Sequence, residues 1–216
     1  VFASSAQFEG LTWNCALSTA STADWATAIQ NGCPGARLAL GQQFSASQLI
    51  QLYQRLGLTE TPAIPLPVNQ SGSLSPGEQV EGLALGQTGL LVSPLQVALA
   101  ATMLSGNGIR PSPRISSAVR TPLQGWVILS ADSAGQPGAS INASKSTAQH
   151  LQNSGLPIWQ STATARSTQG ELSWFIAGTL PEKQLTPLAL ALVLEDGSPS
   201  QAQSIGRELL QFILLP

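Results

Sequence analysis

The side chains from which this chain could build a nucleophilic site are serine hydroxyls, two lysines and one histidine. A serine that attacks a carbonyl needs a neighbouring base to take its proton, and a lysine three residues further on can serve. The two lysines are Lys145 and Lys183, and three positions before them stand Asn142 and Leu180. The sequence given therefore holds no Ser-x-x-Lys pair.

Other polar patterns in the chain are less specific. Two stretches, 105–107 and 140–142, have the letters Ser-x-Asn, which a serine-rich chain produces by chance. His150 lies on a predicted helix with no carboxylate or serine at a spacing that identifies a partner, so we expect a surface or packing role. With one histidine and no Cys-x-x-Cys, the sequence predicts neither a metal site nor a cofactor.

The two cysteines, Cys15 and Cys33, lie 18 residues apart. Their number and spacing are compatible with a disulfide or with two free thiols, and a zinc site would lack ligands. We favour the disulfide, which would indicate an oxidising compartment outside the cytoplasm.

The composition of the chain excludes several classes of function. Only 9% of the 216 residues are charged, against about 25% in an ordinary soluble domain, and the net charge is −2. Scattered lysines and arginines give no electrostatic footprint for nucleic acid and no polybasic patch for a membrane. The longest apolar stretch, 185–194, is too short to span a bilayer and indicates a central strand. We expect any leader or anchor to lie on a segment before Val1.

Periodicity and breakers predict helices first and a sheet later in the chain. An amphipathic helix pair is expected within 22–57, and a long loop or cleft rim over the Pro- and Gly-rich residues 59–82. Ser93 as cap and Pro94 at the first position begin a buried helix that ends near Gly106.

The second half of the chain predicts an antiparallel sheet. We expect two short extended segments at 113–120 and 125–132 and a helix at 142–155. Three strands follow at 157–166, 171–180 and 186–195, and they must be antiparallel because short turns join them. A closing helix is expected at 198–215. The fold class is therefore α+β, an antiparallel sheet covered by helices with an adjoining helical subdomain.

Several ordered motifs in this sequence resemble the penicillin-binding protein transpeptidase domain. The run from 83 to 114 matches the pattern GQG…(T/S)PLQ…A…NGG…P, through Gly86, Gln87, Ser93, Pro94, Leu95, Gln96, Asn107, Gly108 and Pro111. The end of the chain matches the family's last strands and closing helix, through Trp174, Phe175, Gly178, Pro181 and Glu195. The resemblance covers about residues 12 to 214.

The resemblance implies a single domain of the transpeptidase or β-lactamase-like fold, incomplete at its N-terminus. Residues 1–82 would form a helical subdomain and cleft-rim loop, and 83–216 the buried helix, the sheet and the closing helix. The family's first two strands would precede this chain, so we expect an unpaired sheet edge that other residues or a partner chain fill. Some family members carry paired cysteines before their Ser-x-Asn motif, which agrees with a Cys15–Cys33 disulfide.

The same resemblance implies that the family's active-site motifs are absent or altered in this chain. The Ser-x-x-Lys motif would precede this chain or has been lost, and Gly32, Cys33 and Pro34 align with Ser-Cys-Asn. Residues 161–165, Ser-Thr-Ala-Thr-Ala, align with Lys-Thr-Gly-Thr-Ala. We predict no catalytic residue in the chain, and a degenerate ligand-binding strand through Ser161, Thr162 and Thr164. The alternative to ligand binding is that these three residues place their hydroxyls on the exposed face of an ordinary strand.

Loss of the lysine removes a charge-assisted partner for a carboxylate, worth roughly 1.5 to 3 kcal/mol. Arg166 is no replacement, because at five residues from Ser161 on a strand it points to the opposite face. We therefore expect a non-catalytic, extracytoplasmic structural or protein-binding domain linked to peptidoglycan assembly, tethered by a segment outside this chain. One alternative is an active D,D-transpeptidase with its nucleophile elsewhere. A second is an unrelated secreted binding module.

The partners expected follow from these alternatives. A cell-wall or membrane-anchored protein would be the partner of a non-catalytic domain. A peptidoglycan peptide or a β-lactam would bind if activity persists, and no nucleic acid is expected.

Overall fold

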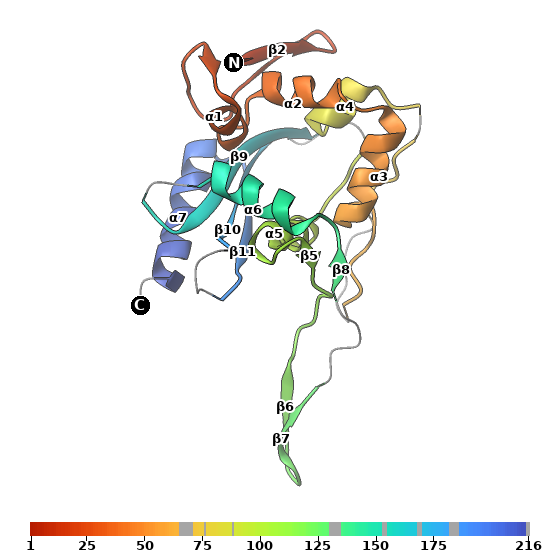
Figure 1. Cartoon of the computed structure of the whole chain (residues 1–216), viewed down its shortest axis with the longest axis vertical. Coiled ribbons are helices and arrows are strands. Elements are labelled where there is room, and N and C mark those ends of the chain that lie inside the picture. Colours follow the sequence, from red (N-terminus) through yellow and green to blue (C-terminus); the bar gives the residue numbers. More distant parts are fainter. Residues whose placement is uncertain are drawn as a thin grey trace.

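A three-stranded antiparallel sheet forms the centre of the fold (Figure 1). The computed structural model describes the chain except residues 65–70, 76, 88, 130–134, 153–154, 168–169, 182–185 and 215–216. The sheet has the order β11-β10-β9, built from β9 (Ile158–Ser167), β10 (Gly170–Thr179) and β11 (Ala189–Glu195). The three predicted strands, their antiparallel pairing and the α+β class are confirmed.

One face of the sheet is covered by the closing helix α7 (Pro199–Leu214). Phe175 is fully buried beneath it, beside Leu210. Gly206 allows this approach, because a Cβ there would lie 2.1 Å from the Phe175 ring. The predicted closing helix is therefore present, but it packs on the sheet through Ala202, Gly206 and Leu210, whereas Ile205, Leu209 and Ile213, which its apolar periodicity assigned to the packed face, are exposed.

The opposite face is covered in part by α5 (Pro94–Ser105) and α6 (Ile141–His150). The cap of α5 is the one expected, with Ser93 and Gln96 bonded in a reciprocal capping box. Trp159 of β9 is buried in this layer, and its indole N–H donates to the Ser105 hydroxyl at 2.9 Å. Helix α6 ends at His150, earlier than the predicted 155.

The helical subdomain has more elements than the sequence indicated. Its helices are α1 (Trp25–Gln30), α2 (Pro34–Gly41), α3 (Ala46–Leu56) and α4 (Val80–Leu85). The prediction of a helix pair in 22–57 was wrong, because Gly32 and Pro34 divide the first segment into two helices. The predicted loop over 59–82 is also cut short at its end by α4, while 65–70 and 76 lie outside the described residues.

Short strands at the N-terminus were not predicted. Strand β1 (Phe2–Ala3) pairs with β4 (Thr22–Ala23), and β2 (Ser5–Phe8) forms a hairpin with β3 (Leu11–Asn14). They lie beside α1 and α2 (Figure 1). The N-terminal segment is therefore a cover for the helical subdomain.

A second hairpin projects away from the body of the molecule (Figure 1). Its base is β5 (Ile109–Arg110) paired with β8 (Gln136–Pro137), and its arm is β6 (Ala118–Thr121) paired with β7 (Gly125–Ile128). The extended segments predicted at 113–120 and 125–132 correspond to this arm, with 130–132 outside the described residues.

Strand β11 lies at the edge of the sheet, and among the described residues β10 is its only strand partner. Helix α7 beside it exposes an apolar stripe of Ile205, Leu209, Phe212 and Ile213. The sequence predicted an unpaired edge filled by other residues or by a partner chain, and that filling stays a prediction. In the part of the chain that the structure describes, no helix is long and apolar enough to cross a membrane.

Candidate functional site

The turn between α1 and α2 presses against the outer strand β9. Gly32 in this turn has φ +66°, and a Cβ on it would lie 2.3 Å from the carbonyl oxygen of Thr162. The Ser161 hydroxyl donates to the carbonyl oxygen of Ile29 at 2.7 Å. The two stretches singled out from the sequence, Gly32-Cys33-Pro34 and the start of β9, are therefore brought side by side.

A disulfide holds this turn from the other side. Cys33 is fully buried and bonds Cys15, with the sulfurs 2.03 Å apart. Cys33 is also the N-cap of α2, and Pro34 follows at the first helical position. The turn is thus fixed between a covalent link and a strand.

Beyond the turn lies a cleft of about 760 Å³ between the sheet and the helical subdomain. One wall comes from the sheet and the other from α2, α3, α4 and the segment leading to α5. The sheet wall is apolar apart from Thr164 and Arg166, and it consists of Ala163, Thr164, Ala165, Arg166, Leu172, Trp174 and Ile176. Such a concave, largely apolar hollow with a few polar groups is the usual form of a ligand site.

Arg37 of α2 is the charged group on the wall opposite the sheet. Its side chain is half-buried, and among the described residues its guanidinium has no hydrogen-bond or ion-pair partner. One guanidinium nitrogen would lie 3.1 Å from a Cβ at Gly32, so the group stands where the turn meets β9. Burial lowers the pKa of Arg37 from its ordinary value, yet an arginine stays charged in proteins.

Tyr53 of α3 lies in the same wall of the cleft. Its hydroxyl donates to the carbonyl oxygen of Leu83, which joins α3 to α4. Burial raises the pKa of the Tyr53 phenol, so the hydroxyl is neutral near pH 7. Its hydrogen is already donated to Leu83, which leaves only the oxygen to accept a further hydrogen bond. Among its described lining residues, the cleft therefore offers one unpaired cation, Arg37, opposite a largely apolar sheet wall.

Residues 5–178 match the family described as the penicillin binding protein transpeptidase domain. The chain belongs to this family. The match covers most of the helical subdomain, the buried helix α5 and two strands of the sheet. No curated protein sequence matches the chain.

Solved transpeptidase structures share its fold at low sequence identity. An imipenem acyl-enzyme complex of penicillin-binding protein A from M. tuberculosis has a TM-score of 0.79 at 20% identity, over 98% of this chain and 53% of that one. The D,D-transpeptidase domain of a peptidoglycan glycosyltransferase from Eggerthella lenta has a TM-score of 0.75 at 17% identity, over 99% and 60%. The transpeptidase fold is thereby shown, and the chain spans about half to three fifths of these structures.

The three predicted ligand-strand residues of the transpeptidase domain have different surroundings. Thr164 lines the cleft, whereas Ser161 is bonded to Ile29 and is not part of the lining. Thr162 is fully buried on the α7 side opposite Phe175, and its hydroxyl has no partner among the described residues. Ligand binding at this strand therefore stays a prediction for Thr164, and burial removes Thr162 from reach of the cleft.

Arg166 lies at the end of the cleft, with its guanidinium carbon 4.6 Å from the centroid of the Trp13 ring. This cation–π contact holds the Arg166 guanidinium away from Ser161, and strand alternation also places the two side chains on opposite faces. Sequence reasoning weighed Arg166 and missed Arg37. The available signal was the position of Arg37 in the first turn of the helix that begins at Pro34, directly after Gly32 and Cys33.

The two chance Ser-x-Asn matches have structural roles. Ser105 is buried and accepts the Trp159 indole hydrogen bond, and Ser140 caps α6 by accepting from the Ala143 N–H at 3.2 Å. His150 is exposed at the end of α6, with Nδ1 2.7 Å from the Ser146 carbonyl oxygen. None of them lines the cleft.

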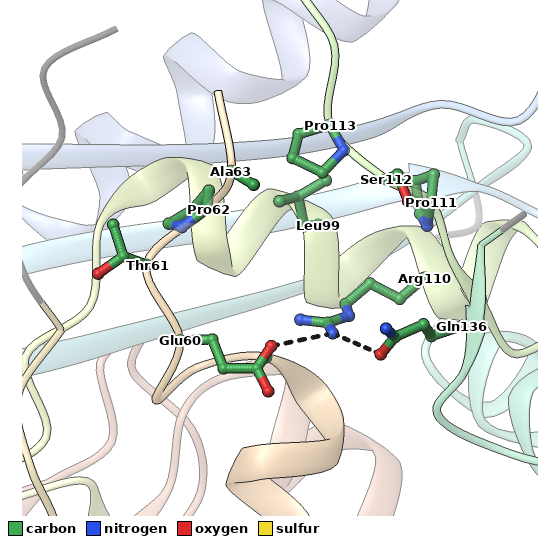
Figure 2. Close-up of a pocket in the computed structure, with 11 residues that line it drawn as sticks. Glu60, Thr61, Pro62, Ala63, Leu99, Arg110, Pro111, Ser112, Pro113 and Gln136 are labelled. Atoms are coloured by element: carbon green, nitrogen blue, oxygen red, sulfur yellow. Dashed lines mark hydrogen bonds and ion pairs between the residues drawn. The ribbon is translucent and has the colours of Figure 1, made fainter. Parts of the chain in front are cut away.

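A second hollow of about 360 Å³ lies away from β9, between α5 and the base of the projecting hairpin (Figure 2). Arg110 extends across it and donates to a Glu60 carboxylate oxygen at 3.3 Å and to the Gln136 amide oxygen at 3.0 Å. The Arg110 side chain is 14% exposed and its charge is paired. This hollow is a joint between three segments of the chain, in contrast to the cleft with its unpaired Arg37.

Proposed function

We propose that this transpeptidase-type domain has kept the fold of its family and lost the acyl-transfer chemistry. It would serve as a structural or protein-binding domain outside the cytoplasm, in the assembly of peptidoglycan. The observation that carries the proposal is the composition of the cleft. No lysine is among the described residues that line it, and the sequence resemblance aligns Gly32 and Pro34, in the turn beside it, with the family's hydroxyl and amide residues.

The chemical argument concerns proton transfer and charge. Acyl transfer to a serine needs a base within hydrogen-bond reach of the hydroxyl, and removing such a group costs orders of magnitude in rate. Ser161, which the sequence resemblance aligns with the family's strand lysine, donates its hydroxyl hydrogen to a backbone carbonyl of α1. Arg37 cannot act as the base, because its guanidinium does not release a proton near neutral pH.

Reaction with a fluorescent β-lactam tests the loss of chemistry. The longest expressed form of the protein is incubated with the reagent beside a known penicillin-binding enzyme, and intact mass is measured in native and denatured samples. We expect no adduct on this protein and a labelled control. A covalent adduct on a serine overturns the proposal and favours the alternative, an active enzyme whose nucleophile lies outside the 216 residues.

Arg37 favours a second candidate function, binding of a carboxylate-bearing peptide without acylation. A half-buried guanidinium without a partner is costly, and a carboxylate satisfies it with two charge-assisted hydrogen bonds. Thr164 and the outer edge of β9 lie on the other wall, where an extended peptide could add to the strand. The ligand would be a peptide of the cell wall with a free C-terminal carboxylate.

Calorimetric titration with an N-acetylated D-alanyl dipeptide and its C-terminal amide tests this binding. We expect the free acid to bind at least about tenfold more tightly than the amide, and Arg37→Gln to abolish the difference. Arg55→Gln is the matched control and should preserve it, since Arg55 is an exposed arginine of α3 that does not line the cleft. Equal binding of acid and amide by the unaltered protein contradicts the role of Arg37 and leaves the mass measurement unaffected.

A further inference from the structure

The arm of the projecting hairpin, β6 and β7 with their connecting turn, packs almost entirely on itself. Among the described elements neither strand makes more than marginal contact with a third one. Figure 1 shows the arm extending well beyond the helices and the sheet. An isolated two-stranded hairpin is only marginally stable in water, so a projecting arm of this kind indicates a surface that something else covers.

The turn of the arm is specifically built. The Thr121 hydroxyl accepts from the Gln124 N–H at 3.1 Å, and Gly125 has φ +70°. This is the chemistry of a hairpin loop closed by a glycine in the left-handed region. Its effect is to hold Leu123 at the tip, where the residue is 97% exposed.

The side chains behind the tip form an exposed apolar face. Trp126 is 72% and Ile128 is 83% exposed, and both point to one face of the hairpin because they are two residues apart. The register places Arg120 directly opposite Trp126 on that face. A tryptophan, an isoleucine and a leucine concentrated on one arm exceed the scattered apolar residues that a protein surface normally carries.

The charge of the arm has one sign. Arg114 and Arg120 are exposed, and residues 111–129 contain no aspartate or glutamate, although the whole chain has a net charge of −2. The arm is therefore a small cationic, aromatic and aliphatic projection on an otherwise slightly acidic molecule. Such a surface complements a partner that is both anionic and apolar.

We propose that the β6–β7 arm is a peripheral membrane contact that places Leu123, Trp126 and Ile128 in the interface of a bilayer containing anionic lipids. Tryptophan prefers the boundary between headgroups and acyl chains, and arginines beside it pair with lipid phosphates. The outer edges of the two strands have unpaired backbone groups that need water, which limits insertion to the headgroup boundary. The sequence lacks a polybasic patch, so the apolar tip supplies most of the binding.

This inference goes beyond the proposed function and does not depend on whether the cleft is catalytic. An acidic protein partner is the competing occupant, but it would need an apolar groove for the tip in addition to its charge. A lipid interface provides both properties in one medium. The test therefore uses vesicles without any other protein.

Co-flotation with vesicles measures the contact, using phosphatidylcholine alone and phosphatidylcholine mixed with phosphatidylglycerol. We expect the unaltered protein, in its longest expressed form without any membrane-spanning helix, to bind the anionic vesicles. Leu123→Ser combined with Trp126→Ser should lower the partition coefficient by about tenfold or more. Arg120→Gln should lower it about fivefold on anionic vesicles and have little effect on neutral ones.

Leu11→Ser is the matched control, since Leu11 is a 46% exposed leucine in the other hairpin of the chain. It should bind as the unaltered protein does. Thermal unfolding of all variants should coincide, because the arm contributes little to the core. The proposal is overturned if the unaltered protein does not float with anionic vesicles, or if the tip variant floats equally well.

Discussion

Gly32 combines two separate requirements for glycine at the turn between α1 and α2. Its φ of +66° is a conformation that costs other residues about 1 to 2 kcal/mol. In addition, a Cβ would lie 2.3 Å from the Thr162 carbonyl oxygen, so the turn and β9 would have to separate. We expect Gly32→Ala to lower the free energy of unfolding by about 3 kcal/mol or more, measured by urea denaturation.

Gly10→Ala separates these two costs. Gly10 has a similar φ of +73°, but nothing lies within 4 Å of the position of its Cβ. This control should lose only the conformational part, about 1 to 2 kcal/mol. Equal losses for the two variants would show that the turn does not press on β9, and the description of the cleft would have to change.

At this scale the sequence predicted part of the candidate site. Strand spacing separated Arg166 from Ser161, but of the three ligand-strand residues predicted, Ser161, Thr162 and Thr164, only Thr164 is among the lining of the cleft. Arg37 could not be found in the same way, because its importance comes from the approach of α2 to β9. That approach depends on Gly32 and on the Cys15–Cys33 disulfide, which join segments far apart in sequence.

Among the elements, the packing of α7 on the sheet offers a clear conflict between local propensity and tertiary contact. Gly206→Ala improves intrinsic helix propensity by about 1 kcal/mol. The new Cβ would lie 2.1 Å from Cδ1 of Phe175, whose ring is fully buried and cannot move aside. Overpacking of this kind costs about 1 to 3 kcal/mol, so we expect a lower melting temperature despite the better helix former.

Gln211→Ala is the control on the same helix. Gln211 is exposed, so its replacement should change stability by only a few tenths of a kcal/mol. A melting temperature for Gly206→Ala at or above that of the unaltered protein, measured by circular dichroism, would mean that α7 sits further from the sheet than described.

Elements with strong local signals were predictable, and those defined by tertiary contact were not. Helix α5 has a cap at Ser93 and a proline after it, and the central strands are separated by turn residues, so both followed from the sequence. Helix α4 is six residues long and begins without a side-chain cap hydrogen bond, which leaves little for a local pattern to show. The strands β1 and β4 are two residues each, and only their pairing defines them.

For the whole molecule, the Cys15–Cys33 disulfide links the N-terminal strands to the helical subdomain and bears on where the protein resides. A bond that closes a loop of 18 residues stabilises by about 3 kcal/mol, chiefly by restricting the unfolded chain. We expect a reductant to lower the urea midpoint of the unaltered protein. It should not affect a variant with both Cys15→Ala and Cys33→Ala, because that variant has no bond to reduce.

Alkylation before reduction, followed by mass spectrometry, tests the bond itself on protein secreted to an oxidising compartment. No cysteine should be modified until reductant is added. Disulfides of this kind persist outside the cytoplasm and are rare within it, so the oxidised state supports the proposed extracytoplasmic location. Two freely alkylated thiols in the secreted protein would remove that support. They would also leave the α1–α2 turn held only by its contact with β9, and the predicted cost of Gly32→Ala would then rest on that contact alone.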